Sequence, residues 1–196
     1  LKDFVAAGNG AFIACGDQTT PDSFQACFAD SGLIPQLQIV RTREAPPQAE
    51  QIIRVAPLSI PPGWLNRFRS DPARSFLKAT FDAWCLVKIS PAAAKGAVPG
   101  DSMPLVLATL ATADPLLLQS RCGDGIVLVM TTTLDRKWTD FPTRSDFVPF
   151  LYEAVFHIAS ARSHRNVNFG EPLIAQLRLA ADADVSAADV SGNRAR

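Results

Sequence analysis

Cys15 is the residue of this sequence whose type and position best suit covalent chemistry. It follows the apolar run 11–14 and precedes Gly16 and Asp17, so we expect it where a strand enters a loop. A thiol close to the N-terminus of a helix, such as the one that Pro21 opens, ionises more readily and becomes a nucleophile. The chemistry would be thiol-dependent hydrolysis or transfer of an amide.

Two histidines, His157 and His164, are available to remove the proton from such a thiol. An active thiol needs one of them as a base within about 3 Å. His157 lies deep in a segment expected to be helical, and His164 follows the end of that segment. We therefore favour a buried, inert Cys15, and keep as the alternative a thiol-dependent amidohydrolase that uses Cys15 with His157 or His164.

A metal site is not expected. Glu153 and His157 are four residues apart, which puts both on one side of a helix, but no third ligand accompanies them. The four cysteines lie far apart and form no CxxC pair, and they sit in or beside apolar segments, where free thiols are common. Their redox state stays open: Cys15, Cys27, Cys85 and Cys122.

Two polar loops are candidate binding surfaces. One holds Gly16, Asp17 and Gln18, and the other holds Asp135 and Trp138. Open α/β sheets bind ligands at the carboxyl ends of their strands, which is where both loops are expected. The structural alternative is that polar residues of the second loop tie the turn onto the helix that follows it. These residues include Arg136, Asp140 and Arg144.

Composition excludes some classes of function. Nineteen basic and nineteen acidic residues cancel, so the chain has no net field to attract nucleic acid or an anionic membrane. The longest apolar runs, 103–110 and 125–130, are far shorter than the roughly 20 residues that cross a bilayer. We therefore expect neither nucleic-acid binding nor direct membrane contact by this chain, and we predict no cofactor.

The elements that position these residues indicate an α/β domain. Apolar residues fill 125–130 on both faces, which is typical of a strand inside a covered sheet, and 147–161 has the apolar spacing of a long helix. Asp146 is the expected N-cap, because Pro149 then falls in the first turn. Further strands are predicted at 11–15, 37–40, 52–55, 80–89, 104–109 and 116–120.

The strands at 104–109, 116–120 and 125–130 are joined by short turns, which predicts an antiparallel meander beside a largely parallel sheet, while the loop 90–102 separates 80–89 from them. The polar, proline-bearing stretch from Arg43 to Gln51 is expected to be an exposed loop. Trp64 and Trp84 are expected in the core.

Several short stretches, taken together, resemble a known family. They are 1–5 with 8–10 and 16–18, then 32–35, 121–125, and 131–138 leading to 147–150 and 166–172. They are similar to the glutamine-amidotransferase-like domain of large bacterial membrane proteins that carry an aerotolerance-type membrane segment and a von Willebrand A domain. Residues 12–18 also resemble the Gly-x-Cys-x-Gly nucleophile turn of class I amidotransferases, but the first glycine is missing and no His-x-Glu pair follows.

The resemblance implies a flavodoxin-like three-layer sandwich over residues 1–172, with its first strands upstream of Leu1, and the start of a β-sandwich-like domain at 173–196. It implies a non-catalytic structural or protein-interaction module whose partners are other domains of the same chain and other proteins. It also implies a membrane-anchored bacterial parent protein, with this soluble domain in the cell envelope or periplasm.

Overall fold

The computed structural model describes residues 1–46, 52–70, 75–90, 103–160, 187–188 and 194–195. The chain divides into two units, Leu1–Ser163 and His164–Arg196. In the second unit the described residues are the short strands β7 (Ala187–Ala188) and β8 (Arg194–Ala195), which pair antiparallel. Most of the β-sandwich-like domain expected at 173–196 therefore lies outside the described residues.

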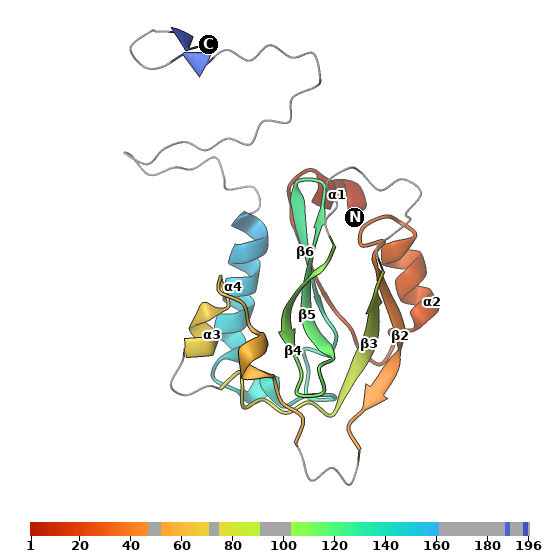
Figure 1. Cartoon of the computed structure of the whole chain (residues 1–196). Helices are drawn as coiled ribbons and strands as arrows, with labels where there is room; N and C mark the ends of the chain where they lie inside the picture. Colours follow the sequence, from red (N-terminus) through yellow and green to blue (C-terminus); the bar gives the residue numbers. More distant parts are fainter. Residues whose placement is uncertain (47–51, 71–74, 91–102, 161–186, 189–193, 196) are drawn as a thin grey trace. The chain divides into compact units, whose positions relative to one another are not determined.

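The first unit is built on a four-stranded mixed sheet with the order β1-β6-β5-β4 (Figure 1). Strand β1 (Gly10–Ala14) runs parallel to β6 (Gly125–Met130), and β6, β5 (Pro115–Cys122) and β4 (Leu105–Thr109) form the predicted antiparallel meander. Every residue of β6 is buried, as its apolar sequence predicts. A mixed sheet is thus confirmed, although among the described strands only the β1–β6 pair is parallel.

A second sheet of two strands corrects part of the prediction. Strand β3 (Ala83–Ile89), predicted as the first of the consecutive strands in this half of the chain, pairs antiparallel with β2 (Leu37–Glu44) in a separate sheet. Arg43 was expected in a loop, yet it lies in β2, because its guanidinium stacks on Trp84 and bonds to Asp114. The strand expected at 52–55 is reduced to a single bridge between Val55 and Leu110.

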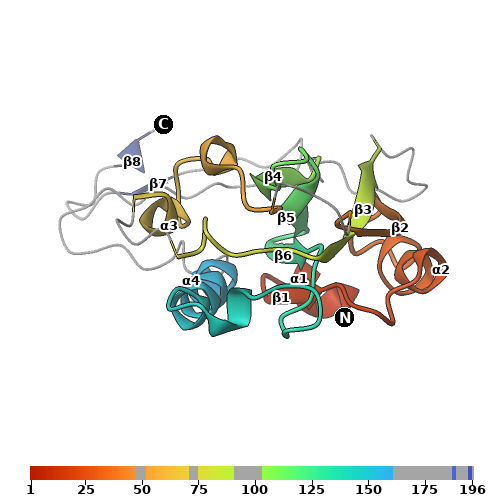
Figure 2. The same cartoon turned by 90° about the horizontal axis from the view of Figure 1, so that it is seen from below.

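The helices lie on the two faces of the main sheet. Figure 2 shows α4 and α3 on one side of it, and β2, β3 and α2 on the other. The predicted long helix is α4, which begins directly after Asp146. The helical segments are α1 (Lys2–Ala6), α2 (Pro21–Phe24), η1 (Gln25–Ala29), η2 (Pro57–Ser59), α3 (Asn66–Ser70), η3 (Phe141–Thr143) and α4 (Phe147–Ser160).

Each face of the main sheet has its own apolar core. The α4-side core contains Phe150 and the β6 side chains Leu128 and Met130. The β3-side core contains Val127 and Val129, which point the other way because side chains alternate along a strand. Trp84 is buried in the α4-side core and Trp64 packs against it, as expected. Because the sheet separates the two cores, candidate residues in different cores cannot contact each other.

Candidate functional site

The thiol of Cys15 is closed off from solvent. Its backbone N–H donates to the carbonyl of Met130, at 2.9 Å, so it continues the β1–β6 pairing, and the residue is only 2% exposed. Its side chain is hydrogen-bonded to Cys85, which is also buried, in the β3-side core. That hydrogen bond, together with burial, raises the pKa of the Cys15 thiol far above its usual range. Burial disfavours the ionised form of the Cys15 thiol, so the expected stabilisation of a thiolate by a helix N-terminus does not operate here.

His157 lies on the opposite face of the main sheet from Cys15. Its ring stacks on Trp64, with 4.9 Å between centroids, and its Nε2 lies 2.7 Å from Oε1 of Gln119 on β5. Trp64 belongs to the surroundings of the α4-side core, whereas Cys15 lies in the β3-side core. Burial, and then the charge of Arg121, lowers the pKa of His157. The sheet thus separates this imidazole from the thiol, and His164 lies outside the described residues.

The two candidate loops contact each other. Lys137 Nζ and Asp17 Oδ2 form an exposed ion pair at 2.7 Å, which links the loop after β1 to the loop after β6. Lys137 lowers the pKa of Asp17, and Asp17 raises the pKa of Lys137. Sequence reasoning did not single out Lys137, whose only signal was its place beside Trp138.

Most polar groups of these loops are engaged with other parts of the first unit. The hydroxyl of Thr132 donates to the Ala83 carbonyl at 3.0 Å, and the Gly16 N–H donates to Oγ1 of Thr19 at 2.9 Å. Asp135 accepts a hydrogen bond from the backbone of Lys137 at 2.9 Å, and Trp138 packs against the β3-side core. Gln18 is exposed. These contacts build the loops.

Asp140 fastens the second loop to the segment before β3. Its Oδ1 accepts a hydrogen bond from the Thr80 N–H at 2.8 Å, and its Oδ2 pairs with Arg144. Burial alone would raise the pKa of Asp140, but the hydrogen bonds from Arg144 and Thr80 outweigh it and lower the pKa. Asp140 therefore has a structural role, as in the alternative interpretation, but it ties the loop to Thr80 and not to the helix that follows. Arg136 is exposed.

Glu153 and His157 contact different residues. Glu153 Oε1 lies 3.8 Å from the guanidinium of Arg67, while His157 bonds to Gln119. Within the described residues, no group of three His, Cys, Asp or Glu side chains could hold a metal ion.

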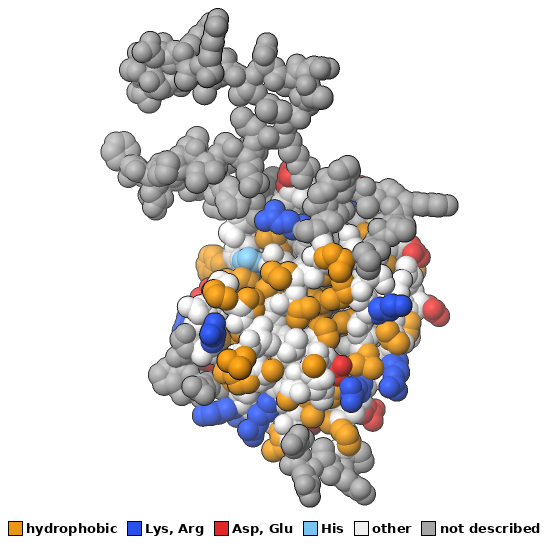
Figure 3. All heavy atoms as spheres, viewed as in Figure 1, with side chains coloured by type: hydrophobic (Ala, Val, Ile, Leu, Met, Phe, Trp, Pro, Cys, Tyr) orange, Lys and Arg blue, Asp and Glu red, His pale blue; other side chains and the backbone are white. Residues whose placement is uncertain are grey.

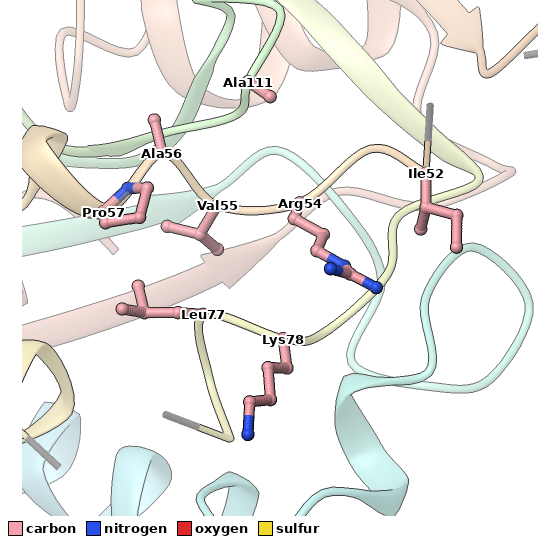
Figure 4. A pocket seen from close by; sticks show the side chains of 8 residues that line it. All are labelled: Ile52, Arg54, Val55, Ala56, Pro57, Leu77, Lys78 and Ala111. Carbon is pink, nitrogen blue, oxygen red and sulfur yellow. The ribbon is translucent and has the colours of Figure 1, made fainter. Parts of the chain in front are cut away.

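A pocket of about 500 Å³ lies between the segment 52–57, residues 77–78 and Ala111 (Figure 4). Its walls include the apolar side chains of Val55, Pro57 and Leu77, and its lining carries two cations, Arg54 and Lys78. The lining residues come from three segments that are far apart in the sequence and share no motif. Sequence reasoning therefore had no signal for this pocket.

Comparison with known proteins identifies the fold and no family. No family model matches the chain, and no curated protein matches it. Cytoplasmic Protein STM1381 from Salmonella typhimurium LT2 superposes with a TM-score of 0.58 and 14% identity, over 80% of this chain and 58% of that one. Cytoplasmic Protein STM3548 from Salmonella typhimurium gives a TM-score of 0.56 and 13% identity, over the same shares.

At such low identity the likeness establishes a mixed α/β fold alone, and this chain spans 58% of the length of each matched structure. Both matched proteins are described as cytoplasmic, which overturns the expected location in the cell envelope. In the part of the chain that the structure describes, no helix combines the length and the apolar character that a membrane crossing requires.

Proposed function

We propose that this chain is a non-catalytic protein-interaction module. The observation that carries the proposal is the environment of Cys15: the residue is 2% exposed, and its free thiol faces the free, buried thiol of Cys85. His157, the histidine that the structure describes, lies across the sheet on Gln119. A cysteine nucleophile needs an adjacent base, a lowered pKa and access for the substrate. In this arrangement Cys15 has none of the three from the described residues.

Apolar surface supports an interaction role. On the face drawn in Figure 3, hydrophobic side chains gather near the centre, over β4 and β5, between scattered charges. Leu105 of β4 is about half exposed. A separate set of large apolar side chains is exposed along α4. Contiguous apolar surface on a soluble protein marks a site of interaction more often than a chance exposure.

The proposal includes a flavodoxin-like arrangement of the first unit. It is supported by the parallel β1–β6 pair and by α4, which follows β6 and packs back over both strands. A helix that follows a strand and packs back over a parallel pair is a feature of that fold class.

A glutamine-like electrophile tests the proposal against the amidohydrolase alternative. The folded chain is incubated with a γ-chloroketone analogue of glutamine, and adducts are located by peptide mass mapping. We expect no adduct at Cys15 and no ammonia release from glutamine above background. An adduct at Cys15 in the folded chain, with ammonia release that Cys15→Ala abolishes, would contradict the proposal.

A further inference from the structure

In the part of the chain that the structure describes, β1 is an edge strand of the main sheet. All of β6 is buried, but the residues of β1 are half-buried or exposed although they are apolar. Charged residues and prolines usually guard an edge strand against pairing, and β1 contains neither. The other edge is better covered, because the backbone N–H of Ala56 and the hydroxyl of Ser59 bond to Thr109 at the end of β4.

The hydrogen-bonding groups of this edge follow from the pairing with β6. The Cys15 N–H donates to β6, and backbone groups alternate in direction along a strand. The N–H and C=O groups of Gly10, Phe12 and Ala14 therefore point away from β6. Among the described strands, none pairs with β1 on that side.

One side of α4 borders this edge with apolar side chains. His157 contacts β5, so its side of the helix faces the interior of the sheet. Val155 is turned roughly 200° from His157, because an α-helix has about 3.6 residues per turn, and so faces the opposite way, past β1. Val148 and Tyr152 continue this outer flank of α4, and the three side chains are between 55% and 65% exposed.

We infer that the β1 edge and the outer flank of α4 form a self-complementary surface that binds a second copy of this chain. The inference rests on the proposed interaction function and names its partner. In the dimer, β1 pairs antiparallel with β1 of its partner about a twofold axis at Phe12. That register is the one in which all three outward-facing residues, Gly10, Phe12 and Ala14, find partners, Gly10 opposite Ala14 and Phe12 opposite itself.

The spacing of the helices favours a second copy over a lone strand from another protein. Helix α4 packs on both β1 and β6, so its axis lies between them. Neighbouring strands are about 4.8 Å apart, which places the two α4 axes about 10 Å apart across the twofold axis, close to the distance at which helices pack. The outer flanks would then cover each other, whereas a lone strand would leave most of them in water.

The test is the mass of the full chain in solution, measured by sedimentation equilibrium over a concentration series. We expect a species of twice the 21.1 kDa chain mass. Two variants should weaken the dimer by different mechanisms. Ala14→Pro removes an outward N–H without touching the β6 ladder, and Tyr152→Asp places a charge on the outer flank. Leu58→Asp is the matched control, because Leu58 is 92% exposed on η2.

We expect the dissociation constant of the dimer to rise at least about tenfold in Ala14→Pro and in Tyr152→Asp, and to stay unchanged in Leu58→Asp. Circular dichroism shows whether each variant is folded. If Ala14→Pro unfolds, Tyr152→Asp still tests the dimer, because Tyr152 is exposed on the helix. A monomer at every concentration would overturn the inference, as would a dimer that both variants leave intact. Neither result depends on the reactivity of Cys15, so this test fails or succeeds separately from that of the proposed function.

Discussion

Asp114 holds together the hairpin turn between β4 and β5. Its Oδ2 accepts hydrogen bonds from Nε1 of Trp84 at 2.9 Å, from Thr112 at 2.8 Å and from Arg43 at 3.1 Å. Trp84 is fully buried, so its indole N–H has no access to water if this acceptor is lost. One carboxylate thus joins both sheets.

Asp114→Ala should lower the free energy of unfolding by about 2–3 kcal/mol, because it leaves the indole donor buried and unpaired. Urea denaturation measures the change. Asp114→Asn keeps an acceptor oxygen and should retain more than half of the stability that Asp114→Ala loses. Equal losses in the two variants would show that charge, and not the acceptor, matters at this position.

His157 makes stability depend on pH near neutrality. Its pKa is lowered below its usual 6.5, so the unfolded chain takes up this proton before the folded chain does. The contribution to stability is therefore complete above about pH 6.5 and is lost as the pH falls through the lower, folded-state pKa.

The melting temperature should accordingly fall between about pH 7.5 and pH 5.5, and His157→Gln should reduce that fall. His164 is kept in both proteins, so its own contribution cancels in the comparison. A pH dependence that is identical in the two proteins would place the titrating group elsewhere.

At the residue scale, the sequence predicts whether a residue lies at the end of a strand, but not which distant residue packs against it. Cys15 is at the strand end, as predicted, and Asp17 contacts the loop of Asp135 and Trp138 through Lys137. The burial of Cys15 on Cys85 could not be predicted, because these residues are seventy positions apart and are joined only by the docking of β3. The face of α4 that carries His157 likewise depends on how the helix packs.

Strand β1 and helix α4 pack so closely that one position has no room for a side chain. A Cβ built on Gly10 would lie 2.5 Å from Cβ of Ile158 and 2.9 Å from its carbonyl oxygen. Real carbon atoms do not approach that closely, so the helix would have to move away from the strand.

Gly10→Ala should therefore destabilise the fold by about 1–3 kcal/mol, as overpacking in a core does. Gly16→Ala is the matched control, because its added Cβ would meet only Thr133 Cγ2, at an ordinary 3.5 Å. Thermal denaturation of both variants measures the difference. Similar melting temperatures would mean that α4 is not seated on β1 as closely as the structure shows.

At the element scale, periodicity and capping predict the local structure well. The strand at 125–130 and the helix from 147 are where their apolar patterns place them, and Asp146 precedes the helix as expected. The Asp146 carboxylate, however, accepts a hydrogen bond from the distant Phe76 N–H at 2.7 Å. Strand pairing is also non-local, which is why the β2–β3 sheet could not be predicted from short connections.

At the scale of the whole molecule, the mixed α/β class follows from the order of elements, while location does not. The membrane-anchored setting was inferred from the resemblance of short stretches, and those stretches carry no information about the compartment. The two matched structures, which share the fold at 14% and 13% identity, are described as cytoplasmic. Among the described strands, β1 lies at one edge of the main sheet, where the proposed second copy would bind.

Counting the reactive thiols of the folded chain tests most directly whether Cys15 is sealed. The chain is alkylated with iodoacetamide with and without denaturant, and each cysteine is located by peptide mapping. We predict that the exposed Cys27 is modified in the folded chain, while the buried Cys15, Cys85 and Cys122 react only after unfolding. Modification of Cys15 in the folded chain at the rate of Cys27 or faster would contradict the account.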